Sequence, residues 1–101
     1  TGWGAHELID TSYMFDSCAS LREVVFGAMD LSGVLRAQSM FDGCTELERI
    51  AHEGRGMQNV RNAARLFFGC KSLEHVPGGF VDLALAEDAY RAREGCPAPL
   101  P

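Results

Sequence analysis

Runs of charge of one sign and long apolar runs are both missing from this sequence of 101 residues. Nine Lys and Arg residues are spread thinly against fourteen Asp and Glu, for a net charge of −5 at neutral pH. A protein that follows the phosphates of nucleic acid, or lies on an anionic membrane, needs clustered positive charge. No stretch approaches the roughly 20 apolar residues of a membrane-spanning helix. We therefore expect no nucleic acid partner and no direct membrane span.

A leader is also missing from the start of the sequence. The first residues lack the basic segment followed by an apolar one that marks a secretory signal peptide. Because the chain begins with Thr1, we expect either a fragment of a longer protein or a mature subunit whose targeting leader has been removed. A chain of this length has room for one domain, over residues 1–101.

Close cysteine pairs are absent, although the sequence contains four cysteines. They recur at equal intervals along the chain, as Cys18, Cys44, Cys70 and Cys96. Zinc sites usually draw ligands from near pairs such as Cys-x2-Cys, and a disulfide needs Cα atoms about 4.4–6.8 Å apart. Free, buried thiols stacked in a file are the favoured interpretation, with disulfides or a metal as alternatives. No cofactor or metal is expected.

The interval between the cysteines is a repeat of the whole sequence. A shift by 26 aligns apolar residues into columns: Met14, Met40 and Leu66; Phe15, Phe41 and Phe67; Leu21, Leu47 and Leu73; Val24, Ile50 and Val76; Leu31, Met57 and Leu83. Repeated short units cannot close a core alone and stack to form a continuous one. Each column should therefore become a file of side chains in contact.

Two local patterns divide each unit. Residues 34–41 carry apolar side chains at the first, fourth, seventh and eighth positions, which predicts a short amphipathic helix. Ser32 or Asn59 would cap its start, and Gly43 or Gly69 would end it. The pattern Leu-x-x-Val/Ile, which begins at Leu21 and recurs in the next two units, predicts a short strand. In the third unit, Pro77-Gly78-Gly79 should cut that strand short.

The segments 14–21, 40–47 and 66–73 resemble the Met/Ala-Phe-x-x-Cys-x-x-Leu core of the BspA-like leucine-rich repeats. The 26-residue spacing is similar to the subfamily found in mycoplasma-type surface lipoproteins. The resemblance implies an α/β fold: a right-handed leucine-rich-repeat solenoid of about four 26-residue units, each with a short parallel strand and a short helix. It also implies a location at the cell surface or outside the cell; a removed leader would instead indicate an organelle.

The ends of the chain depart from the repeat. The fourth unit loses the Met and Phe of the motif and gains prolines, so residues 93–101 are interpreted as a degenerate C-terminal cap. Residues 1–8 are interpreted as a segment that covers the N-terminal end. Trp3 in that segment either covers the stack or anchors a partner.

The outer face of the predicted sheet carries the candidate binding residues. They are Arg22, Glu23, Glu48, Arg49, Glu74 and His75. We expect Arg22 beside Glu48 and Glu23 beside Arg49, so that the face partly neutralises itself. This weakens the case for a strongly charged ligand. His6, His52 and His75 occupy different positions in the repeat and are expected to be surface residues.

No arrangement of an active site is visible in the sequence. An enzyme would need a nucleophile with its base, paired carboxylates or a metal-binding set, and no catalytic residue is assigned. The sequence therefore predicts a non-enzymatic protein–protein interaction module or an accessory subunit of a larger assembly. A fragment of a secreted or cell-surface adhesin is the alternative. The identity of the protein partner stays open.

Overall fold

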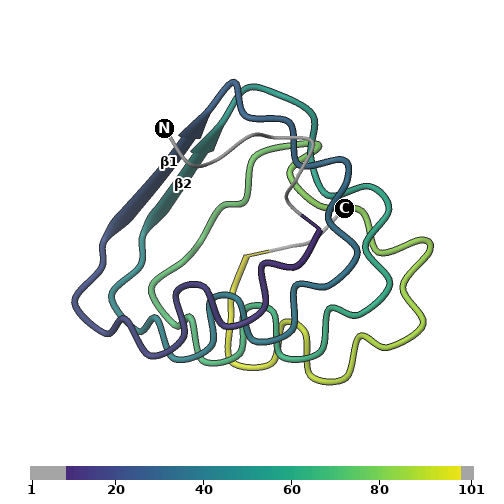
Figure 1. Cartoon of the computed structure of the whole chain (residues 1–101). Coiled ribbons are helices and arrows are strands. Elements are labelled where there is room, and N and C mark those ends of the chain that lie inside the picture. Colours follow the sequence, from purple (N-terminus) through teal and green to yellow (C-terminus); the bar gives the residue numbers. More distant parts are fainter. Residues whose placement is uncertain (1–8, 99–101) are drawn as a thin grey trace.

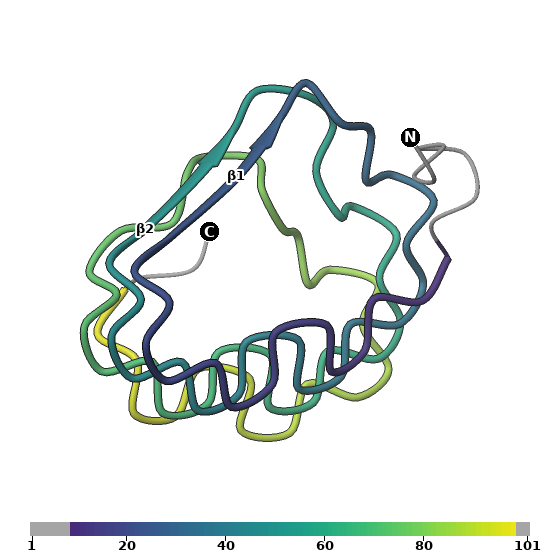
Figure 2. The ribbon, with the colours of Figure 1, turned by 60° about the vertical axis from the view of Figure 1, so that its left-hand side comes forward.

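The computed structural model describes residues 9–98, and it shows a chain that winds once for every unit of the sequence repeat (Figures 1 and 2). Each such winding is called a coil below. Neighbouring coils contact each other, and the whole measures 30 × 29 × 22 Å. Strands β1 (Glu23–Gly27) and β2 (Arg49–His52) come from successive coils and pair in parallel. Glu23 lies opposite Arg49, which is the register that the repeat predicts.

The predicted fold class is wrong. Residues 9–98 contain no helix, and their one sheet has two short strands where the repeat predicted a strand in each unit. The protein is a compact globule, and not a leucine-rich-repeat solenoid of four units that each combine a strand with a helix.

The predicted helices fail because only every second backbone N–H bonds within its own coil. In residues 39–44, Met40 N donates to the carbonyl of Ala37 at 3.2 Å, three residues back. The next N–H, on Phe41, instead donates to the carbonyl of Leu66 in the following coil, at 2.9 Å. An α-helix requires each N–H to bond four residues back along the same segment. The alternation excludes a helix and ties neighbouring coils together.

Backbone torsions at the base of each coil show the same conflict with a helix. Ser39 and Arg65 have φ values of 54° and 57°, and Gly43 and Gly69 have 78° and 76°. The left-handed region costs an L-residue energy and breaks a right-handed helix. We call the four equivalent segments, residues 10–17, 36–43, 62–69 and 88–95, the base segments. They lie side by side in the lower part of both views (Figures 1 and 2).

The third predicted strand is absent at residues 73–76. Pro77 follows it and has no backbone N–H to donate to a sheet. A tight turn then closes with a hydrogen bond from Phe80 N to the carbonyl of Pro77 at 3.1 Å. The prediction that Pro77-Gly78-Gly79 would cut the strand short is consistent with this turn, and the sheet ends at β2.

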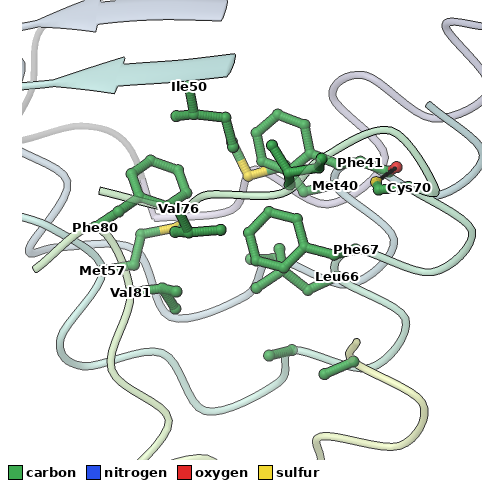
Figure 3. Packing of buried hydrophobic residues seen from close by; sticks show 14 of the residues in the cluster. Met40, Phe41, Ile50, Met57, Leu66, Phe67, Cys70, Val76, Phe80 and Val81 are labelled. Atoms are coloured by element: carbon green, nitrogen blue, oxygen red, sulfur yellow. Dashed lines mark hydrogen bonds between the residues drawn. The ribbon is translucent and has the colours of Figure 1, made fainter. Parts of the chain in front are cut away.

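The core consists of the predicted columns. Phe41 stacks on Phe15 and on Phe67, with ring centroids 5.4 Å apart in each case. Phe80, which the repeat did not single out, is also fully buried, with its ring centroid 6.3 Å from that of Phe41 and 6.5 Å from that of Phe67 (Figure 3). Phe80 packs against Phe26, whose equivalent positions in the next two coils are occupied by His52 and Gly78. The apolar columns therefore predicted burial correctly, even though the helix did not form.

Candidate functional site: a groove along the free edge of β2

A groove of about 340 Å³ runs along β2 on the side away from β1. Residues 48–53 form one wall, and His75 and Pro77 of the next coil form the other. A neighbouring hollow of about 560 Å³ shares Glu48 and Arg49 and is also lined by Lys71, Ser72 and Glu74. The two hollows lie next to each other between β2 and the segment where the third strand was predicted.

The backbone of β2 is paired on one side. Arg49 N donates to the carbonyl of Arg22 at 3.2 Å, and Glu53 N donates to that of Gly27 at 2.7 Å. Successive residues of a strand point their backbone groups to opposite sides, so the N–H groups of Ile50 and His52 point away from β1. Within residues 9–98, no backbone hydrogen bond joins 48–53 to 71–79. The groove is thus bordered by the unpaired edge of a strand.

One of the two predicted ion pairs on this face is present. Arg49 Nε lies 3.6 Å from Glu23 Oε2, as the register predicted. Arg22 lies beside Glu48 in the backbone, as predicted, because its carbonyl accepts a hydrogen bond from Glu48 N at 2.8 Å. The side chain of Arg22 pairs instead with Glu46, at 3.9 Å. Exposed ion pairs are worth so little that the long arginine side chain can equally reach a diagonal neighbour.

The groove keeps an excess of negative charge. Glu48, Glu53 and Glu74 make no ion pair with any residue between 9 and 98. The charge of Arg49 is compensated by Glu23, so Lys71 is the remaining cation among the residues that line the second hollow. Opposite charges on β1 and β2 therefore compensate each other as predicted, whereas the carboxylates on the groove side of β2 stay uncompensated.

Two histidines line the same groove, although they occupy different positions in the repeat. His75 is exposed, as predicted, but His52 is half-buried. The ring of His52 packs nearly perpendicular to the rings of Phe26 and Phe80, and its Nε2 is 3.1 Å from the carbonyl oxygen of Met29. Because a carbonyl can only accept, Nε2 carries a proton and donates it there. His52 thus packs partly into the core and holds the neighbouring coil.

Of the predicted binding residues, the structure gathers four at the groove: Glu48, Arg49, Glu74 and His75. Arg22 and Glu23 lie one strand further, and Trp3 lies outside the described residues. The backbone edge at Ile50 and His52, together with Pro77, was missed as part of a site. Pro77 was the available signal, since a proline that ends one strand leaves its neighbour without a partner.

The cysteines lie away from this groove, in a file through the core. All four are free, and Cys44, Cys70 and Cys96 are buried. The thiol of Cys44 donates to the carbonyl of Phe15 at 3.0 Å, and that of Cys70 to Phe41 at 3.1 Å. Burial raises the pKa of Cys44 to about 11 and that of Cys70 to about 12. Both are therefore neutral, structural thiols at physiological pH.

Between residues 9 and 98, no group of three or more His, Cys, Asp or Glu side chains is arranged to hold a metal ion. The described residues also form no helix long and apolar enough to cross a membrane.

Comparison with family models, with curated proteins and with solved structures finds no match to this chain. The likeness to BspA-like repeats therefore rests on the sequence motif alone.

Proposed function

We propose that the chain is a non-enzymatic protein-binding module that holds an extended, basic segment of its partner against the free edge of β2. The observation that carries this proposal is the unpaired strand edge that borders the groove. An exposed edge is a template onto which another strand can add, with backbone hydrogen bonds giving affinity.

The shape of the groove favours an extended segment. Its floor follows residues 48–53 along the strand, and the opposite wall at Pro77 offers no N–H to compete for the same partner. The outward N–H and C=O groups of Ile50 and His52 are placed to bond one extended backbone. Ala51, which lines the groove between Ile50 and His52, gives the partner's side chains a small apolar contact.

The charge of the groove favours a basic segment. Glu48, Glu53 and Glu74 surround the edge without partners among the described residues, and the whole chain carries −5. Complementary charge speeds association and selects partners, with a strength that falls as salt rises. A segment with Lys or Arg at alternate positions would place its basic side chains on one side, facing these carboxylates.

The groove is less suited to catalysis or to a small ligand. Small-molecule sites are mostly apolar and enclosed, whereas these walls are a strand edge and charged side chains. His52, the half-buried titratable group, is engaged with the carbonyl of Met29 through Nε2. These features support binding of a polypeptide.

The proposal is tested with a fluorescent peptide of alternating Lys and Val, whose anisotropy is followed as protein is added at low ionic strength. The double variant Glu48→Lys/Glu74→Lys should bind about tenfold more weakly than the unaltered chain. The double variant Glu87→Lys/Glu94→Lys is the matched control, because it changes the net charge equally and removes two exposed carboxylates that pair with Arg61 and Arg91, outside the groove. It should leave the affinity unchanged.

A second peptide separates edge pairing from simple charge attraction. The same sequence with alternate backbone nitrogens methylated keeps its charge and loses donors to the strand edge. We expect it to bind at least several-fold more weakly. Equal binding of both peptides, or equal weakening by Glu87→Lys/Glu94→Lys, would show that the free edge of β2 is not the binding site.

A further inference from the structure

The base segments are joined by a ladder in which, from the second residue of each segment onward, the backbone hydrogen bonds run in one direction. Ser39 N donates to the carbonyl of Ala64 at 2.8 Å, and Arg65 N donates to that of Tyr90 at 2.8 Å. Each of these donors lies one coil before its acceptor. The first residue of a later segment differs, since Arg36 N donates back to the carbonyl of Ile9 at 3.2 Å. Because the bonds from the second residue onward run one way, the ladder has two different ends.

The last base segment displays donors, and the first displays acceptors. Within residues 9–98, no acceptor is bonded to the N–H groups at the outward positions of the last segment, which are Ala89, Arg91, Arg93 and Gly95. In the same range, no donor is bonded to the carbonyls at the outward positions of the first segment, which are Asp10, Ser12, Met14 and Asp16. The two ends are complementary in number, spacing and polarity.

We propose that a second copy of the chain stacks head to tail on the first, so that the ladder continues across the junction. The register is fixed by the bonds already present. Ala63 N donates to the carbonyl of Asp88, so Ala89 N, its equivalent in the last coil, would donate to the position equivalent to Asp88 in a following coil. In a second copy that position is Asp10, and the other three donors meet the other three acceptors in the same way.

Side chains at the two ends have the exposure expected of an unfinished stack. Ala37 and Ala63 are fully buried between coils, whereas Ala89 in the same column is exposed. At the other end, Met14 and Phe15 are half-buried, although their counterparts in the next coil have no exposed surface. A head-to-tail junction would bury these groups in the positions that the inner coils already show.

One of the charged side chains at the junction, that of Arg93, has a suitable neighbour. Arg93 stands in the column of the stacked phenylalanines, so it would face Phe15 of the second copy. A guanidinium over an aromatic ring is attractive. The chain already uses this contact, with Arg65 lying 3.9 Å from the centroid of the Phe68 ring.

Head-to-tail contact is heterologous, which gives it a distinctive test. Sedimentation velocity of the unaltered chain, from roughly 10 µM to 1 mM, should show dimers and longer oligomers that grow with concentration. Ala89→Arg places a bulky charge on the donor end, and Phe15→Arg places one on the acceptor end. Each variant alone should associate at least about tenfold more weakly. An equimolar mixture should form a dimer that does not grow, because one intact donor end meets one intact acceptor end.

Controls keep the test decisive if a variant is destabilised. Ala89 is exposed, so Ala89→Arg should keep the native amide spectrum, and it is the variant on which the proposal stands. Gln58→Arg adds the same side chain at an exposed inner position and should associate like the unaltered chain. A chain that stays monomeric up to roughly 1 mM, or oligomers that survive Ala89→Arg, would overturn head-to-tail stacking. Oligomers lost in Glu48→Lys/Glu74→Lys would instead place the contact at the groove and overturn it too.

Discussion

At the scale of single residues, burial was the most predictable property of this chain. The columns of the sequence repeat named the core correctly, because stacking puts equivalent side chains in equivalent surroundings. Phe41 and Leu47, for example, have no exposed surface. Phe80 was missed, since it stands outside the repeat and compensates for the smaller residues that replace Phe26 in later coils. A side chain that fills an irregular space leaves no periodic signal.

The thiols give a test at this scale. At about pH 8 in the native state, a thiol reagent should modify half-buried Cys18 first and the buried Cys44 and Cys70 very slowly. The reactive species is the thiolate, and the raised pKa of about 11 for Cys44 and about 12 for Cys70 keeps both protonated. Mass spectrometry of digested samples measures the label at each position, and all four cysteines should react once the chain is unfolded. Disulfide-linked peptides, or rapid native labelling of Cys70, would contradict this assignment.

At the scale of elements, the helix was predicted wrongly because apolar residues that recur at every third position were interpreted as the 3.6-residue period of an α-helix. Buried side chains recur at every third residue, as in Leu31, Val34, Ala37 and Met40. An α-helix repeats every 3.6 residues and needs some steps of four. A strict step of three arises here from successive tight turns, such as the hydrogen bonds from Val34 N to Leu31 and from Met40 N to Ala37. The strands were better predicted, since the repeat fixed the register of β1 on β2.

The stack of phenylalanines is the element whose loss should cost most. Phe41→Ala removes a ring buried between two others and should lower the free energy of unfolding by about 3–5 kcal/mol. Phe15→Ala should cost clearly less, because Phe15 is half-buried at the end of the stack. Urea titrations of both variants and the unaltered chain measure the difference. Equal, small losses at the two positions would mean that the rings do not stack in this register.

At the scale of the whole molecule, the sequence predicted which segments lie side by side but not where they part. Glu23 and Arg49 meet as the repeat requires, and all four predicted residues at the groove belong to the predicted sheet face. The groove itself depends on the path of the chain after Val76, because Pro77 prevents a third strand from pairing with β2. That path is set by the tight turn at Pro77 and by the burial of Phe80, and neither residue belongs to the regular repeat.

Amide hydrogen exchange measured residue by residue, with and without the Lys–Val peptide, tests the proposed binding edge most directly. The N–H groups of Arg49 and Glu53 donate to carbonyls of the first coil, so they should exchange slowly in both states. Those of Ile50 and His52 point into the groove; they should exchange fast in the free chain and slow markedly when the peptide is bound. Unchanged exchange at Ile50 and His52 at saturating peptide, or protection that appears only elsewhere, would contradict the account.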